Sequence, residues 1–140
     1  MTDPHRIQYL NTDLDLVCDI DPSGLAGEFE SRDFAVDVRV CDDGQFYVLC
    51  EDANDIEPEP NISRLLDVVE SLRGDARVLW NRCSKREFDV GYECGETPWA
   101  FNQGLSNDVL RRMADCGATF RITIYPQHSE SVKRLVYVDP

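Results

Sequence analysis

Aspartate and glutamate are the residues whose types and spacing could do chemistry in this sequence. They alternate with apolar residues in the expected strands, and alternation brings them to one face of a sheet. The charged residues expected on that face are Asp13, Asp15, Asp19, Asp37, Asp89 and Glu93, with Arg39 and Arg121 among them. Clustered carboxylates can do acid–base chemistry or hold a divalent cation. The solvated face of an antiparallel sheet has the same pattern, and we favour that interpretation because the sequence has no EF-hand-type calcium loop.

Cysteine and histidine offer little for a metal site or a catalytic nucleophile. None of the six cysteines forms a Cys-x-x-Cys pair, and the two histidines, His5 and His128, lie near the ends of the sequence. Zinc ligands are spaced more closely, so we expect no metal and no cofactor. Cys94 or Cys116 could pair with His128 as a nucleophile, but Cys116 is expected in a last helical turn, where the dipole raises a thiol pKa. We therefore expect reduced, largely buried thiols and no catalytic residue.

Negative charge is concentrated in the first 60 residues. The formal net charge is −13; residues 1–60 hold 16 acids and 3 bases, whereas residues 61–140 hold 11 of each. This distribution disfavours nucleic acid and anionic membranes and favours a basic protein partner. The acidic groups expected to contact such a partner are Asp13, Asp15, Asp19, Asp42, Asp43, Asp55, Glu57 and Glu59. The alternative is a solvated acidic surface that only aids solubility.

The loop at residues 95–104 is the best candidate for an apolar anchor. It is flanked by Gly95 and Gly104 and contains Trp99 and Phe101. Trp99 could bind the partner, since exposed aromatic side chains often dominate interfaces. Alternatively both rings cover the edge of the sheet, which we expect for Phe101.

Composition predicts one globular domain over residues 1–140. Hydrophobic residues make up 42% of the sequence and charged residues 29%, which excludes a disordered chain. We expect a loose arm at residues 1–12 and an extension at residues 127–140. Neither a signal peptide nor a long apolar run is visible, so the expected location is the cytoplasm.

Strand signals dominate the first third of the chain. Alternation predicts a half-buried strand at residues 13–20 with an acidic outer face, followed by a short helix at residues 23–31. A hairpin follows, with strands at 34–41 and 45–51 joined by a type I′ turn at Asp43-Gly44. The residues expected to face inward in the first hairpin strand are Phe34, Val36, Val38 and Val40.

Helix signals follow an acidic stretch at residues 51–60, which contains prolines and is expected to be an exposed loop. Asn61 is expected to cap a helix that Gly74 ends, and Asp75 to cap a second helix that ends near Cys83. The apolar positions of the first helix are Ile62, Leu65, Leu66, Val69 and Leu72.

The last third of the chain is predicted to form a strand, a loop, a helix and a strand. A strand is expected at residues 85–94, with Phe88, Val90, Tyr92 and Cys94 facing inward. Ser106 is expected to cap the next helix, and Gly117 to end it. The apolar stripe expected on this helix is Val109, Leu110, Met113 and Ala114. Further strands are expected at 118–125 and 134–138.

This order of elements predicts an α+β fold with an antiparallel sheet and two or three helices on one face. Through Cys94 the pattern matches a ferredoxin-like βαββαβ core, to which a C-terminal αβ extension is added.

The segment 86–126 resembles a bacterial domain-of-unknown-function family, some members of which resemble toxin-immunity proteins. The resemblance lies in the run 101–106, the helix through Val109 and Leu110, and the end at 122–125. It implies a non-enzymatic, protein-binding domain, an inhibitor or regulator of a basic partner such as a toxin. Two alternatives stay open: a structural homo-oligomeric domain, such as a homodimer, that uses the sheet face or an edge strand as its interface, and a small enzyme that uses carboxylates or a thiol.

Overall fold

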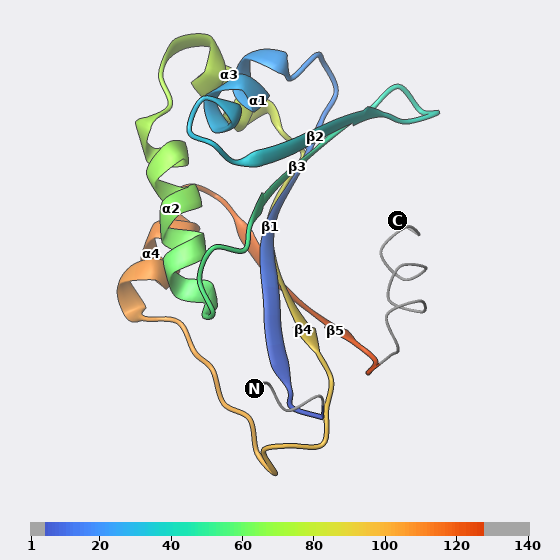
Figure 1. Ribbon diagram of the computed structural model, residues 1–140. Coiled ribbons are helices and arrows are strands. Elements are labelled where there is room, and N and C mark those ends of the chain that lie inside the picture. The colour runs from blue at the N-terminus through green and yellow to red at the C-terminus, as the bar shows by residue number, and fades with distance from the viewer. Residues whose placement is uncertain (1–4, 128–140) are drawn as a thin grey trace.

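Figure 1 shows a computed structural model of the chain, in which residues 5–127 are described. The strands and helices are β1 (Gln8–Cys18), α1 (Ser23–Glu30), β2 (Ala35–Val40), β3 (Phe46–Asp52), α2 (Pro58–Ser71), α3 (Gly74–Arg82), β4 (Lys85–Glu93), α4 (Asn107–Asp115) and β5 (Thr119–Tyr125). The predicted strand at residues 134–138 lies outside the described residues. Among residues 5–127, no helix is long and apolar enough to cross a membrane.

The five strands form one sheet in the order β2-β3-β1-β4-β5. The central strand, β1, pairs antiparallel with both β3 and β4, and β2 pairs antiparallel with β3. In contrast, β5 pairs parallel with β4. The α+β class is confirmed, but the prediction of a fully antiparallel sheet is wrong. The connection through α4 returns the chain to the start of β4, so β5 runs in the same direction.

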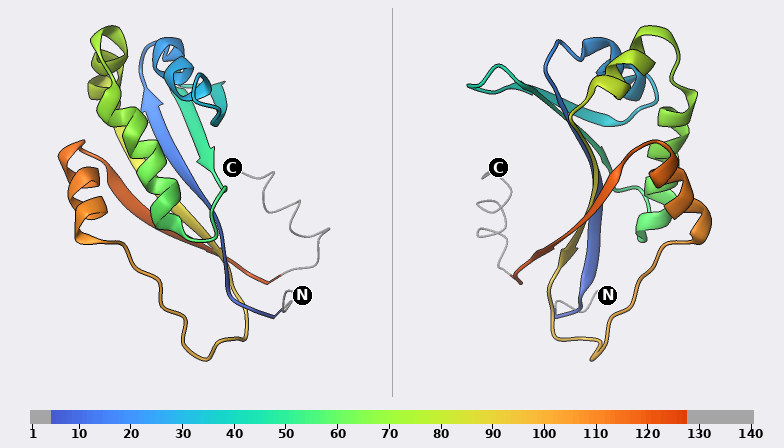
Figure 2. Two further views of the ribbon diagram at one scale, coloured as in Figure 1. Left: turned by 60° about the vertical axis from the view of Figure 1, so that its left-hand side comes forward. Right: turned by 180° about the vertical axis from the view of Figure 1, so that it is seen from behind.

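All four helices lie on one side of the sheet, as the back view in Figure 2 shows. The even-numbered residues of β1 from Thr12 to Cys18 are buried beneath these helices. Phe88 from β4 and Trp80 from α3 are fully buried in the same core. The opposite side of the sheet is not covered by any described element. This arrangement confirms the predicted placement of helices on a single face, with one helix more than expected.

The N-terminal part of β1 replaces most of the expected loose arm. Residues 8–12 are in the strand, where Tyr9 pairs with Tyr92 of β4. A register shift between Tyr9 and Asn11 marks a bulge. Because a bulge adds one residue to the alternation, Tyr9 and Thr12 face the same side, where the Tyr9 hydroxyl lies 2.6 Å from Thr12 Oγ1.

The β2–β3 hairpin is present but differs from the prediction at its turn and on its inner face. Gly44 has a positive φ of 82°, whereas Asp43 does not, which excludes a type I′ turn. The Gly44 N–H donates to the Cys41 carbonyl at 2.9 Å, which closes a three-residue loop. Val38 and Val40 are exposed, because the hairpin projects beyond the region that the helices cover (Figure 1).

The N-cap position of α2 is Glu57, four residues before the predicted Asn61, so Asn61 is buried inside the helix and does not cap it. Pro58 occupies the first turn, where its fixed φ suits a helix and its missing N–H is not needed. The predicted apolar stripe of this helix is buried as expected. Gly74 begins α3 with a φ of 56° and does not end α2.

The last third of the chain confirms the local signals and corrects two side chains. Ser106 Oγ accepts from the Val109 N–H at 3.2 Å, and Gly117 has a φ of 75° directly after α4. However, Leu110 is 49% exposed, because α4 presents Val109 and Met113 to the core. Ala114 of the predicted stripe is also exposed, and so is Cys94, which lies beyond the end of β4.

Substitutions in α4 should separate its buried face from its exposed face. Met113 is 3% exposed, so Met113→Ala should lower the free energy of unfolding by about 2–4 kcal/mol. Leu110→Ala, in the same helix, should cost less than about 1 kcal/mol because the leucine is half in water. Urea denaturation of the two variants measures both values. A larger loss for Leu110→Ala than for Met113→Ala would show that α4 is rotated.

Candidate functional site

The open side of the sheet carries a cluster of half-buried acids, which we call the carboxylate face. Strand register places Asp13 of β1 between Glu51 of β3 and Asp89 of β4. One pair further along, Asp15 lies opposite Glu87 of β4. These five acids form the carboxylate face. The predicted direction of Asp13 and Asp15, away from the helices, is confirmed by the burial of the residues between and around them.

Three members of the carboxylate face, Asp13, Asp15 and Asp89, were predicted from the sequence, and Glu51 and Glu87 were not. Glu51 and Glu87 share the alternation of Leu49 and Asp89 in their own strands, and this signal could have identified them. Among the other acids expected there, Asp37 is exposed on β2, where its carboxylate pairs with Arg39 at 2.7 Å. Glu93 is buried at the end of β4.

Asp13 is the most strongly perturbed acid of the carboxylate face. Burial raises the pKa of Asp13 to about 8, and the charges of Asp15, Glu51 and Asp89 add to this rise. Asn11 Nδ2 donates to Asp13 Oδ1 at 3.3 Å and also donates to Glu51. One amide cannot offset this much like charge, so protonation of Asp13 is favoured near neutral pH.

Asp15 and Glu87 are acids with incompletely satisfied oxygens. Burial raises the pKa of Asp15 to about 6, and the charge of Asp89 contributes next. Asp15 Oδ1 is buried and has no hydrogen-bond partner among residues 5–127. Glu87 Oε1 lies 3.0 Å from Arg121 Nε and 3.4 Å from Lys85 Nζ, close enough for ion pairs but without the angles of a hydrogen bond. The face therefore has acceptor capacity that the described chain leaves unused.

The carboxylate face does not form a metal site in this geometry. Among the described residues, no group of three or more His, Cys, Asp or Glu side chains is arranged to hold a metal ion. Asp89 is held by the Thr123 hydroxyl, which donates to its Oδ1 at 2.6 Å. The strands therefore spread the acids along a surface and do not direct them to one point.

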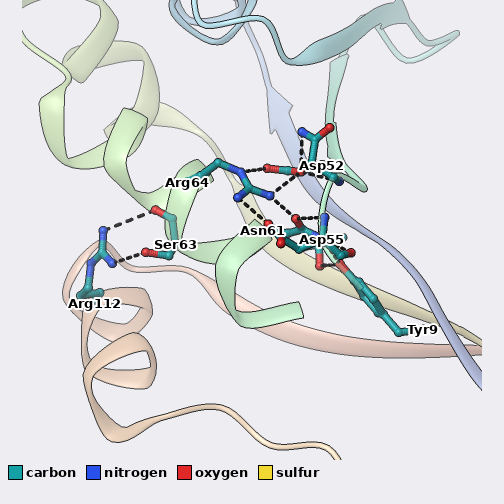
Figure 3. A network of polar contacts seen from close by, with 9 residues as sticks. Tyr9, Asp52, Asp55, Asn61, Ser63, Arg64 and Arg112 are labelled. Carbon is teal, nitrogen blue, oxygen red and sulfur yellow. Dashed lines mark hydrogen bonds and ion pairs between the residues drawn. The ribbon is translucent and has the colours of Figure 1, made fainter. Parts of the chain in front are cut away.

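A second polar cluster lies on the helix side of the sheet and is structural (Figure 3). Arg64 of α2 makes a two-pronged contact with the fully buried Asp52, with Nε 2.8 Å from Oδ2 and Nη2 3.1 Å from Oδ1. Its Nη1 donates to Asp55 Oδ2 at 2.6 Å. Asn61 joins this cluster to β1, since its Nδ2 donates to the Tyr9 hydroxyl at 2.7 Å. We call these five residues the buried network.

Two of the acids that were expected to contact a partner are already bound by groups of this chain. Asp55 is bound by Arg64, and its backbone N–H also donates to Asn61 Oδ1 at 3.0 Å. Glu59 accepts from the Ser106 N–H at the start of α4. The predicted exposed loop at 51–60 is confirmed only for residues 53–57, since residues 51–52 belong to β3 and residues 58–60 to α2.

Four other predicted contact acids lie at separate places. Asp19 follows β1 and pairs with Arg82 at 2.7 Å, and this guanidinium lowers the carboxyl pKa. Asp42 and Asp43 are exposed at the tip of the hairpin. Glu57 is exposed directly before α2.

Trp99 is 99% exposed, but it lies far from the hairpin tip. The tip is at the end of β1 where Cys18 pairs with Phe46, whereas the Trp99 loop follows β4 at the end where Gln8 pairs with Glu93. The strand β1 has 11 residues, and a rise of about 3.3 Å per residue separates the two ends by roughly 30 Å. The structure thus divides the predicted contact residues between two ends of the sheet.

An open groove of about 350 Å³ lies at the Trp99 end. Ile7, Tyr9, Ile56 and Phe101 contribute to its lining. Phe101 also packs edge-on against Tyr92, with ring centroids 5.7 Å apart, which confirms that this ring covers the sheet.

Three of the thiols, those of Cys50, Cys83 and Cys116, lack the setting of a nucleophile. Burial raises the pKa of Cys50, of Cys83 and of Cys116, which keeps these thiols protonated. Cys94 is exposed, and the predicted partner His128 lies outside the described residues.

No family model matches the sequence, and searches of curated proteins and of solved structures found no match. The resemblance of residues 86–126 to a bacterial family therefore stays a prediction, as does the ferredoxin-like core. The candidate site rests on the geometry of this chain alone.

The raised pKa of Asp13 predicts a pH-dependent stability. The pKa is about 8 in the folded state and 3.8 as the ordinary value, so the folded state binds more protons between these pH values. The contribution of Asp13 to the free energy of unfolding therefore decreases as pH rises from about 4 to about 8. We expect Asp13→Asn to raise the urea midpoint much more at pH 8 than at pH 5. Asp75→Asn, at an exposed site in α3, is the matched control. An equal effect of Asp13→Asn at both pH values would contradict the raised pKa.

The buried network predicts a large difference between two arginine substitutions. Arg64→Met leaves the Asp52 carboxylate buried without its cation and should cost about 2–4 kcal/mol of unfolding free energy. Arg112→Met also breaks contacts with two acids, Asp67 and Glu70, but these acids are 63% and 46% exposed and can be hydrated. This second variant should cost about 1 kcal/mol or less. Denaturant melts at one pH compare the two, and equal losses would show that Asp52 does not depend on Arg64.

Proposed function

We propose that this chain is a non-enzymatic binding domain that takes a basic protein surface on its carboxylate face. The observation that carries the proposal is the placement of five half-buried acids on the open side of the sheet, with the raised pKa of Asp13 and the unpartnered Asp15 oxygen among them. The only bases that strand register places beside these acids in residues 5–127 are Lys85 and Arg121.

Electrostatics supports a cationic partner. Burial destabilises the ionised forms of Asp13 and Asp15, and the like charges that the folded chain keeps close together on this face add to that effect. A guanidinium or ammonium group from a partner would offset that repulsion and supply donors to the free acceptor positions. Binding would lower the two pKa values and release protons, so affinity should increase as pH rises from about 5 to about 8.

The hairpin tip adds exposed charge on the same side of the molecule. The tip of the β2–β3 hairpin, a segment that contains Asp42 and Asp43, projects away from the helices toward the open side of the sheet (Figures 1 and 2). The acids at the tip are exposed and contribute mainly to long-range attraction, which raises the association rate. Trp99, at the other end of β1, is not part of this surface.

The family resemblance fits the same proposal, since some members resemble proteins that neutralise toxins by binding. The acidic first 60 residues supply five of the seven acids that form the carboxylate face and the hairpin tip, namely Asp13, Asp15, Asp42, Asp43 and Glu51. A cytoplasmic location, with reduced thiols, belongs to the proposal as well.

Charge-dependent binding of a cationic probe tests this function. An octa-arginine peptide should associate rapidly at about 10 mM salt and much more slowly at 150 mM, because the Debye length falls from about 30 Å to about 8 Å. Asp42→Lys with Asp43→Lys should lower the association rate several-fold. Asp13→Asn with Asp15→Asn should mainly raise the dissociation rate and remove the pH dependence. Fluorescence anisotropy and stopped-flow mixing measure these quantities.

The control variant carries Asp75→Lys and Asp115→Lys, at exposed sites on the helix side. It changes the net charge by the same amount as Asp42→Lys with Asp43→Lys. It should bind the peptide nearly as well as the unchanged protein. If the control loses as much binding as the variants of the open side, the acidic surface acts only through net charge and the proposed site is wrong.

A further inference from the structure

The edge strand β5 exposes a row of large apolar side chains. Phe120, Ile122 and Ile124 are 43%, 56% and 65% exposed. They pair in register with Phe88, Val90 and Tyr92 of β4, and the first two of these partners are buried in the core beneath the helices. The row is therefore on the helix side of the sheet, but α4 packs against α2 and leaves β5 uncovered.

The same strand ends the sheet on one side. In the strand order β5 pairs only with β4, so none of residues 5–127 pairs with its outer edge as a strand. An exposed edge is a template for another strand, because its outward N–H and C=O groups repeat at the spacing of a ladder. A seven-residue edge with an adjacent apolar row combines main-chain pairing with burial of side chains.

We infer that a second copy of this chain pairs antiparallel with β5 across a two-fold axis at Ile122. In this register Phe120 lies opposite Ile124 of the partner subunit, and Ile122 lies opposite Ile122 of the partner subunit. The apolar row is thus complementary to itself, as a two-fold interface requires. The pairing joins two five-stranded sheets into one, with both sets of helices on the same side.

The charge distribution favours a second copy of the chain as the partner, and it favours β5 over β2 as the paired edge. Residues 61–140 carry no net charge, and the one charged residue of β5, Arg121, already pairs with Glu87 at 3.0 Å. A basic partner therefore has no electrostatic reason to choose β5. The opposite edge, β2, belongs to the acidic part of the chain and has an exposed charged pair, Asp37 and Arg39, which is a common protection against edge pairing.

The interface is small, which sets the expected affinity. Two paired seven-residue strands bury less than the roughly 1,600 Å² of a standard stable interface. We therefore expect a reversible dimer with a dissociation constant of about 1–100 μM. This inference does not depend on the proposed binding function, since the outer edge of β5 and its apolar row on the helix side of the sheet are not part of the carboxylate face.

Sedimentation velocity of the full chain between about 1 and 300 μM tests the inference. The unchanged protein should shift from monomer to dimer across this range. Ile122→Lys should stay monomeric at every concentration. Ile124→Lys should behave in the same way, so that the result does not depend on a single variant. Val40→Lys is the matched control, since Val40 is a 66% exposed apolar residue on the opposite edge strand. It should dimerise like the unchanged protein, and far-ultraviolet circular dichroism should show that all variants are folded.

Three outcomes would overturn the inference. One is a chain that is monomeric up to 300 μM, as expected if residues 128–140 of the same copy cover the edge of β5. Another is dissociation of the dimer by Val40→Lys and not by Ile122→Lys, which would assign the interface to β2. The third is a dimer that none of these substitutions affects.

Discussion

The alternation of leucine and aspartate along β1 is the constraint on which the rest of the structure depends. Leu14 and Leu16 are fully buried under the helices, and the aspartates between and before them face the open side. Because β1 is the central strand and pairs on both edges, this division fixes which face of β3 and of β4 becomes core. A shift of one residue would place two aspartates in the core, at a cost comparable with the stability of a small domain.

The buried network holds the segment by which the chain leaves the sheet between β3 and α2. The turn after β3 leads to the start of α2 and carries two acids, the buried Asp52 and the half-exposed Asp55. Arg64 pairs with both Asp52 and Asp55, and Asn61 links this turn to Tyr9 on β1. Buried charge is tolerated here because each member has hydrogen-bond partners, and the same contacts hold α2 at one position against the sheet.

Two surfaces remain incompletely satisfied once the core is formed, and they differ in physical character. The carboxylate face combines like charge with partial burial, and a cation from outside would stabilise it. The outer edge of β5 is nearly neutral and apolar, so another strand suits it better than a charged partner. Their separation reflects the sequence, since the acidic excess is confined to residues 1–60 and β5 comes from the neutral remainder.

Local patterns in the sequence determine much of this fold by themselves. Alternation directs Asp13 and Asp15 away from the core, and local chemistry identifies the Ser106 cap and the Gly117 stop, because these features involve only a few neighbouring residues. Tertiary structure alone decides that Asp13 lies between Glu51 and Asp89, that Leu110 faces water, and that β5 runs parallel to β4. Each of these depends on which distant segments pack together, and periodicity along one segment contains no information about its neighbours in space.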